Sequence, residues 1–105
     1  MNDIEDKGII KIIHNGQSAF MHYLLDGDKL TSLTLGDSEK VADFKKENSL
    51  ELGFGMKPEN FNKAVVHIDE DKDRAKKLFD TMLDLKFTHF KTYTDNLVVL
   101  EIGLI

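Results

Sequence analysis

Two turn signals divide residues 9–35, which read IIKIIHNGQSAFMHYLLDGDKLTSLTL. Asn15-Gly16 follows the first apolar run, and an Asn-Gly pair between apolar runs is typical of a two-residue hairpin turn. Asp26-Gly27-Asp28 follows the second run and contains the same turn-forming residue types. The stretch therefore predicts three consecutive antiparallel strands, at Ile9–His14, Ser18–Leu25 and Lys29–Leu35.

The spacing of apolar residues changes after this stretch and predicts two helices. The first is short, because Asp37 or Ser38 can cap its start and it ends near Asn48. The second runs from about Glu70 to Phe87, and its acidic first turn suits the positive end of a helix dipole. Its apolar residues recur at helical spacing and form one stripe, made of Ala75, Leu78, Phe79, Met82 and Leu83.

Alternating apolar and polar side chains predict three further strands, at Leu50–Phe54, Ala64–Ile68 and Asn96–Ile105. Residues 88–95 fit either a loop or a loop with a short strand. The order β-β-β-α-β-β-α-β predicts an α+β protein, mainly β, in which an antiparallel sheet curls into a small barrel. No linker or repeat interrupts the chain, so we expect residues 1–105 to form a single domain.

The composition restricts what the protein can bind. The 105 residues include 14 Lys and Arg against 19 Asp and Glu, which gives a formal net charge of −5. This acidic balance argues against a nucleic-acid partner, whose phosphates require clustered basic side chains. No apolar run is long enough to span a membrane, and the acidic start MNDIEDKG is unlike a signal peptide. We therefore expect a cytoplasmic protein without a membrane partner.

Thiol and metal chemistry lack their usual sequence signals. The chain has no cysteine, and the histidines are too far apart to form a metal motif (His14, His22, His67 and His89). Asp69, Asp71 and Asp73 alternate as in a calcium loop, but Arg74 stands where that loop requires glycine. We interpret these acids as the start of the second helix, and we predict no metal site.

A candidate anion site lies where the third strand meets the first helix. The backbone N–H groups at a helix start favour an anion, Thr34 and Ser38 add hydroxyl groups, and Lys40 adds a positive charge. The same residues also fit a simpler arrangement, in which a serine or aspartate caps the helix and the lysine is solvated. Spacing alone leaves both interpretations open.

A family resemblance rests on four segments: Asp26–Leu30, Thr34, Ser38–Val41 and Leu50–Phe54. Together they resemble the pyridoxamine 5′-phosphate oxidase-like family of FMN-binding split barrels, and the likeness extends over roughly residues 8 to 102. The resemblance implies a six-stranded antiparallel Greek-key split barrel with two helices. It also implies a homodimer that holds FMN at the interface between its subunits.

The resemblance assigns roles to five residues. Thr34, Ser38 and Lys40 match positions that hold the FMN phosphate in the family, although Glu39 stands where the family often has arginine. The strand Phe20–Tyr23 would follow the flavin ring mainly through its backbone, with His22 or Tyr23 facing the ligand. Because the flavin itself performs the redox chemistry, the sequence identifies no catalytic side chain.

Two functions follow as alternatives. The first is an FMN-binding flavoprotein, an oxidoreductase of unknown substrate; a deazaflavin or haem could occupy the same place. The second is a cofactor-free split-barrel dimer that serves as a small-ligand or protein interaction module, and an unrelated α+β domain is a third possibility. A dimer is expected because some apolar residues exceed what a small core needs, namely Phe87, Phe90, Tyr93, Leu104 and Ile105.

Overall fold

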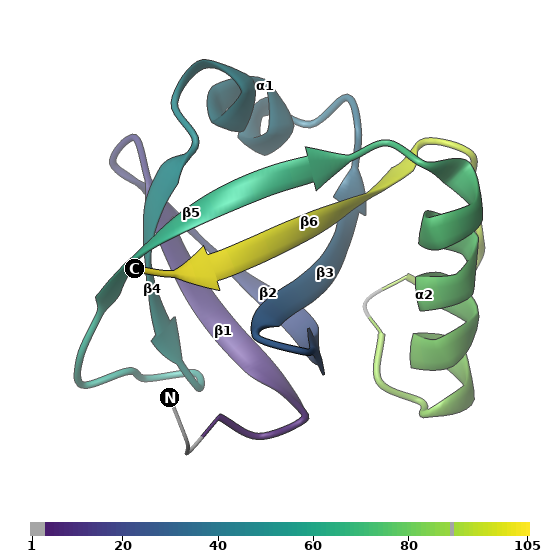
Figure 1. The fold of residues 1–105 in the computed structure, drawn as a ribbon, viewed down its shortest axis with the longest axis horizontal. Coiled ribbons are helices and arrows are strands. Elements are labelled where there is room, and N and C mark those ends of the chain that lie inside the picture. Colours follow the sequence, from purple (N-terminus) through teal and green to yellow (C-terminus); the bar gives the residue numbers. More distant parts are fainter. Residues whose placement is uncertain (1–3, 89) are drawn as a thin grey trace.

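Six antiparallel strands form a closed barrel, and two helices lie outside it (Figure 1). The structure is a computed structural model that describes residues 4–88 and 90–105. Its strands are β1 (Lys7–His14), β2 (Gln17–Asp26), β3 (Lys29–Leu35), β4 (Ser49–Phe54), β5 (Asn62–Asp69) and β6 (Leu97–Leu104). Its helices are α1 (Glu39–Lys46), which lies above one end of the barrel in Figure 1, and α2 (Lys72–Asp84), which stands beside it.

The strand order around the barrel is β1-β2-β3-β6-β5-β4, and β1 pairs with β4 to close it. The first three strands are joined by hairpins, after which the chain crosses to β4 and returns through β5 to β6. This arrangement confirms the predicted six-stranded Greek-key barrel with two helices.

Local turn chemistry explains why the first three strands form where they do. Asn15 and Gly16 both adopt positive φ, at 49° and 76°, as a tight hairpin turn requires. Gly27 has a φ of 62° in the second turn. The first turn sets the register of β1 against β2, which pair from Lys7↔Leu24 to His14↔Gln17.

The described residues form two apolar clusters rather than one. The larger fills the barrel and includes Ile10, Ile12, Met21, Tyr23, Leu52, Val66, Leu100 and Ile102. The smaller lies between the barrel wall and α2, and it contains Leu33, Ala75, Phe79, Met82, Leu97 and Val99. As a result β6 is buried on both faces along its first half, which accounts for the unbroken apolar run Leu97–Leu100.

Helix α2 and the loop that follows it differ from the sequence prediction. Helix α2 is shorter at both ends: it begins after its cap Asp71 and ends before Lys86, whose φ of 56° is incompatible with a continuing helix. Its apolar stripe is narrower, because Leu83 is exposed. Residues 88 and 90–95 contain no strand, and His89 lies outside the described residues.

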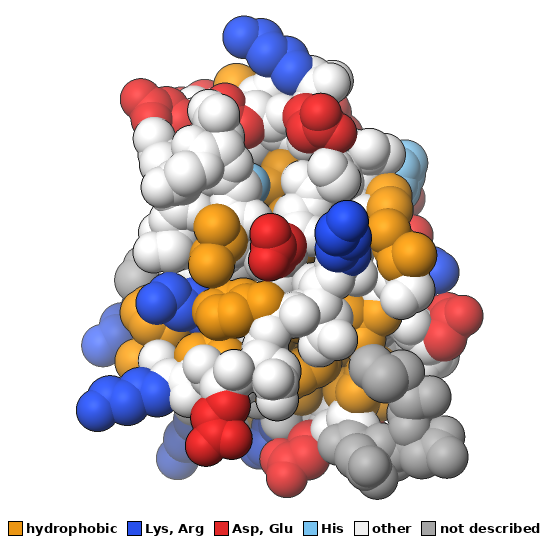
Figure 2. All heavy atoms as spheres, turned by 90° about the vertical axis from the view of Figure 1, so that its left-hand side faces the viewer, with side chains coloured by type: hydrophobic (Ala, Val, Ile, Leu, Met, Phe, Trp, Pro, Cys, Tyr) orange, Lys and Arg blue, Asp and Glu red, His pale blue; other side chains and the backbone are white. Residues whose placement is uncertain are grey.

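On the face shown in Figure 2, apolar side chains group over the lower half, and acidic and basic side chains are scattered around them without forming a continuous patch of either charge. None of the helices in residues 4–88 and 90–105 is long and apolar enough to cross a membrane.

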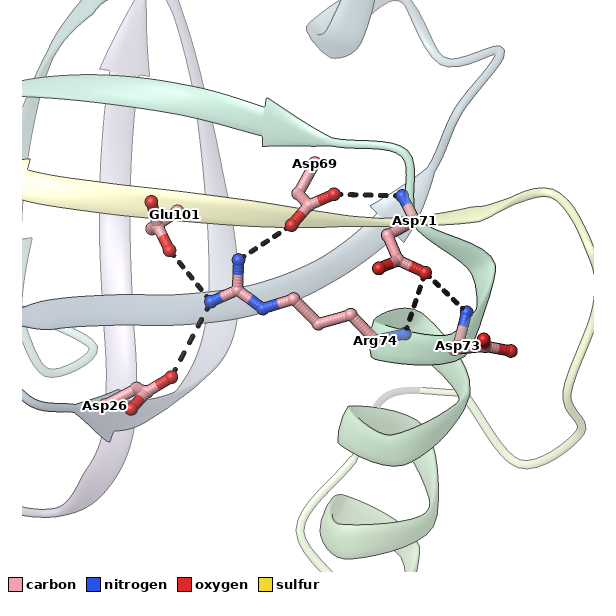
Figure 3. A network of polar contacts seen from close by, with 6 residues as sticks. All are labelled: Asp26, Asp69, Asp71, Asp73, Arg74 and Glu101. Atoms are coloured by element: carbon pink, nitrogen blue, oxygen red, sulfur yellow. Dashed lines mark hydrogen bonds and ion pairs between the residues drawn. The ribbon is translucent and has the colours of Figure 1, made fainter.

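Arg74 attaches α2 to the barrel (Figure 3). Its guanidinium donates to Asp69 of β5 and to Glu101 of β6, at 2.8 Å each, and lies 3.6 Å from Asp26 at the end of β2. Asp71 instead caps the helix by accepting from the backbone N–H groups of residues 73 and 74. Of the acids that resemble a calcium loop, Asp69 thus bonds to Arg74 and Asp71 caps the helix, and the described residues contain no cluster of three potential metal ligands.

Replacing Arg74 should make the free energy of unfolding less dependent on pH in the acidic range. The hydrogen bond from Arg74 holds the pKa of Asp69 below its usual value, so this carboxylate stabilises the fold above its ordinary pKa and loses that effect as the pH falls through the lowered one. We expect Arg74→Met to reduce the free energy of unfolding at pH 7, with a smaller difference from wild type below about pH 4. Urea unfolding followed by circular dichroism measures this, with Lys77→Met as the control for net charge. A difference that is the same at every pH would contradict the assignment.

Candidate functional site

The barrel is split between β2 and β3. These strands pair only from Leu24↔Thr31 to Asp26↔Lys29, next to their turn. Beyond that point β2 continues along β1, while β3 continues along β6 to Leu35↔Leu97. The first half of β2 and the second half of β3 therefore separate and leave an opening in the barrel wall.

Two buried hydroxyl groups stand where the strands separate. The Thr31 hydroxyl donates to the Leu24 carbonyl at 2.8 Å, and the Ser32 hydroxyl donates to the His22 carbonyl at 2.6 Å. A buried backbone carbonyl without a partner would destabilise the fold, so Ser32 replaces the ladder bond that the split removes at His22, while Thr31 adds a second bond to the last paired carbonyl. Their only sequence signal is two adjacent hydroxyl residues in the middle of a buried strand.

The split opens into a cleft of about 230 Å³. Its walls come from β2 and β3, one end is formed by the start of α1, and α2 and the following loop cover one side. Thr34, Ser38 and Lys40 give the α1 end of the cleft its polar groups, and elsewhere polar side chains such as Ser32 and Thr88 are mixed with apolar and aromatic ones. The lining residues are Phe20, Met21, His22, Ser32, Leu33, Thr34, Leu35, Ser38, Lys40, Met82, Thr88 and Phe90.

Lys40 is the cation of the cleft. Its ammonium group is half-buried and donates to the hydroxyl of Thr34 at 2.9 Å. Burial lowers its pKa from the usual value of 10.5. Among the residues that the structure describes, no carboxylate lies within 4 Å of this ammonium group, whereas Lys45 on the same helix pairs with Glu70 at 3.2 Å. The positive charge of Lys40 therefore faces the cleft without a compensating anion.

Ser38 is the cap of α1, as one interpretation of the sequence predicts. Its hydroxyl accepts from the backbone N–H of Val41 at 3.3 Å, and the same hydroxyl can donate its proton to a ligand. Asp37 and Glu39, its neighbours, are exposed and do not line the cleft. Capping and anion binding are thus compatible at this helix start.

Four of the five predicted site residues lie around this one cleft, namely His22, Thr34, Ser38 and Lys40. Tyr23 does not line it. Tyr23 points into the barrel core, is 2% exposed and donates its hydroxyl to the Glu5 carbonyl at 3.1 Å. His22 points outward, and its ring meets that of Phe87 edge-on at 4.6 Å.

The sequence prediction omitted the apolar part of the site. Phe20 shares the outer face of β2 with His22, so period-two alternation could have identified it. Met82 and Phe90 come from α2 and the following loop, and no local pattern indicates that these segments reach the β2–β3 opening.

The cleft environment predicts an unusual titration of Lys40. Because burial opposes the charged form, its amine should titrate below 10.5, and Thr34→Val should lower the pKa further by removing an acceptor for the ammonium group. NMR of the reductively methylated protein measures this, with Lys40→Arg identifying the signal. A pKa at or above 10.5 would contradict a buried amine without an anionic partner.

No family model matches the sequence, and no curated protein matches it either. Among solved structures, the fold is similar to that of a candidate pyridoxamine 5′-phosphate oxidase from Listeria innocua. The match has 13% sequence identity and a TM-score of 0.69, and it covers 95% of this chain and 84% of that chain. General stress protein 26 from Bacillus anthracis str. Sterne matches with 20% sequence identity and a TM-score of 0.63, and the match covers 94% of this chain and 79% of that chain. A FAD-binding protein from Mesorhizobium loti matches with 10% sequence identity and a TM-score of 0.63, and the match covers 96% of this chain and 82% of that chain. At these identities the likeness concerns the fold, and it confirms that this chain has the split-barrel fold that the sequence predicts.

Proposed function

We propose that the protein binds a flavin, FMN, in the cleft between β2 and β3 and acts as a flavin-dependent oxidoreductase. The observation that carries this proposal is Lys40, a half-buried cation without a carboxylate partner in the described part of the chain, at the polar end of a cleft whose remaining lining includes aromatic and apolar side chains. Such a cleft suits a ligand with an aromatic body and an anionic end. A bound flavin would supply hydride or electron transfer, and the protein would bind and orient it.

The polar end fits a phosphate. Lys40 provides the charge, and the hydroxyls of Thr34 and Ser38 can donate to phosphate oxygens once the ammonium of Lys40 turns from Thr34 to the ligand. The cleft thus holds three donor groups of the type that recognise a phosphate monoester.

The split fits the edge of a flat heterocycle. Successive residues of a strand direct their backbone N–H and C=O groups to opposite neighbouring strands. The Leu25 N–H donates to Asp6 of the segment before β1, so the odd-numbered residues of β2 bond toward β1. The even-numbered residues, Phe20 among them, therefore direct their backbone groups toward β3. The Gly36 N–H donates to Asn96, so even-numbered residues of β3 bond toward β6 and Leu33 directs its backbone groups toward β2. These groups face the split where the ladder between the described strands has ended, and they can bond the alternating donors and acceptors of a flavin ring.

The proposal includes a homodimer in the cytoplasm. A cleft of about 230 Å³ is smaller than the usual ligand pocket of about 300–1,000 Å³, so a second copy would complete it. Phe20 and Leu35 leave apolar surface at its rim. The sequence predicts a dimer from five apolar residues in excess of the core. Of these, Ile105 is 83% exposed, and the other four are half-buried, namely Phe87, Phe90, Tyr93 and Leu104. The rim of the cleft is therefore the better candidate for the interface.

The alternative, a cofactor-free interaction module, has one observation in its favour. Asp37 and Glu39 flank Ser38 in sequence and are exposed, so they weaken the attraction of this helix start for a phosphate. A protein that binds no flavin by titration, with the cleft as described, would support this alternative.

Flavin titration tests the phosphate assignment. Lys40→Glu should abolish FMN binding, and Lys40→Met should weaken it about ten- to a hundred-fold through loss of a charge-assisted hydrogen bond. Glu39→Arg should strengthen it about five-fold. Quenching of FMN fluorescence measures the affinity, and riboflavin, which lacks the phosphate, should bind equally well to wild type and Lys40→Met.

Lys45→Glu is the matched control, because Lys45 lies on the same helix but outside the cleft. An equal loss of FMN affinity in Lys45→Glu and Lys40→Glu would assign the effect to net charge. Unchanged FMN affinity in both Lys40 variants would contradict a phosphate site at this helix.

Sedimentation tests the dimer. The wild type should sediment as a dimer at tens of micromolar, and Leu35→Asp should shift it toward monomer by placing a charge at the cleft rim. Val65→Asp is the control, because Val65 is also an exposed apolar residue but lies on β5, away from the cleft. A wild-type monomer, or a dimer disrupted only by Val65→Asp, would exclude the proposed interface.

A further inference from the structure

We infer that Phe20 is the stacking surface for the flavin ring and that Lys11, behind it, favours the reduced state of that ring. The inference rests on the proposed function, since it concerns the same cleft. It assigns a role to two side chains outside the phosphate site.

Phe20 is placed to stack against a ligand. It lies on the outer face of β2, lines the cleft and is 48% exposed, and it belongs to neither apolar cluster. An aromatic ring that fills no core and borders a cleft is available to a planar ligand. The backbone of the same residue borders the split, so a ring that bonds to that backbone would pass close to the side chain.

Lys11 lies against the Phe20 ring from the neighbouring strand. Lys11 and Phe20 are opposite each other in the β1–β2 ladder, and the ammonium nitrogen is 5.6 Å from the ring centroid. The strand order is β1-β2-β3, so Lys11 approaches from the β1 side while the cleft opens on the β3 side. No carboxylate of the described residues lies within 4 Å of this ammonium group, so its charge is not neutralised nearby.

This geometry has an electronic consequence. A cation over one face of a phenyl ring draws its π electrons toward that face and leaves the opposite face less negative. That opposite face then stacks more favourably on an electron-rich ring than on an electron-poor one. A reduced flavin is richer in electrons than an oxidised one, and the positive charge of Lys11 also favours any negative charge that reduction adds.

The test combines two variants of Phe20 with two of lysine. Phe20→Leu should weaken FMN binding about ten-fold and reduce its fluorescence quenching, and Phe20→Tyr should restore both, because tyrosine keeps an aromatic face. Lys11→Met should leave the affinity for oxidised FMN nearly unchanged and lower the ratio of reduced to oxidised affinity about two- to five-fold. Dithionite titration against a reference dye gives that ratio from the midpoint potential of bound FMN.

Lys7→Met is the matched control. Lys7 lies on the same strand and is 5.5 Å from the ring centroid of Phe87, so its substitution removes an equal charge and a similar contact. Phe87 touches His22 but does not itself line the cleft, so the potential of bound FMN should change clearly less than in Lys11→Met.

The possible failures are distinct. If the wild type binds no FMN, the proposed function itself fails, and the inference with it. If the wild type binds FMN and Phe20→Leu binds it equally well, only the stacking role fails. An equal shift of potential in Lys7→Met and Lys11→Met would show a general charge effect and overturn the role of Lys11. A loss of FMN affinity that accompanies loss of the dimer, by sedimentation of Phe20→Leu, would assign Phe20 to the interface instead.

Discussion

Where β2 and β3 separate, the His22 carbonyl would lose its ladder partner inside a largely buried wall, and the hydroxyl of Ser32 supplies the missing donor. A buried carbonyl left without a donor would cost about 1–3 kcal/mol. The barrel can therefore open on one side while the rest of its ladder remains closed. The cleft, its backbone edges and its access to ligand all depend on this substitution of side-chain for backbone hydrogen bonds.

The second apolar cluster determines how the opening is covered. Helix α2 packs over the outer faces of β3 and β6, and Arg74 joins its start to Asp69 and Glu101 of the barrel. Met82, near the end of the helix, then lines the cleft together with residues of the following loop. The ion pairs of Arg74 lie far from the site along the helix, yet they contribute to the position of its covering element.

The chemistry of the site contrasts with that of the whole chain. The protein has a net charge of −5, but the cation that borders the cleft is a lysine whose partner in the described structure is the neutral hydroxyl of Thr34. A half-buried cation is stabilised by an anion, and the cleft offers a place for one beside an apolar, aromatic wall. This combination is the physical basis for proposing a ligand that is aromatic at one end and anionic at the other.

Local chemistry made most of the fold predictable from the sequence. The Asn-Gly and Asp-Gly pairs determine the hairpins through backbone conformations available within two residues, and the cap at Ser38 depends on a contact three residues away. Which of His22 and Tyr23 faces the cleft depended on strand register, and the double burial of Leu97 and Val99 depended on where α2 packs. The split itself, and the meeting of Phe20, Lys40 and Met82 around it, were decided only by the tertiary structure, because they depend on which strands pair over long separations and where that pairing ends.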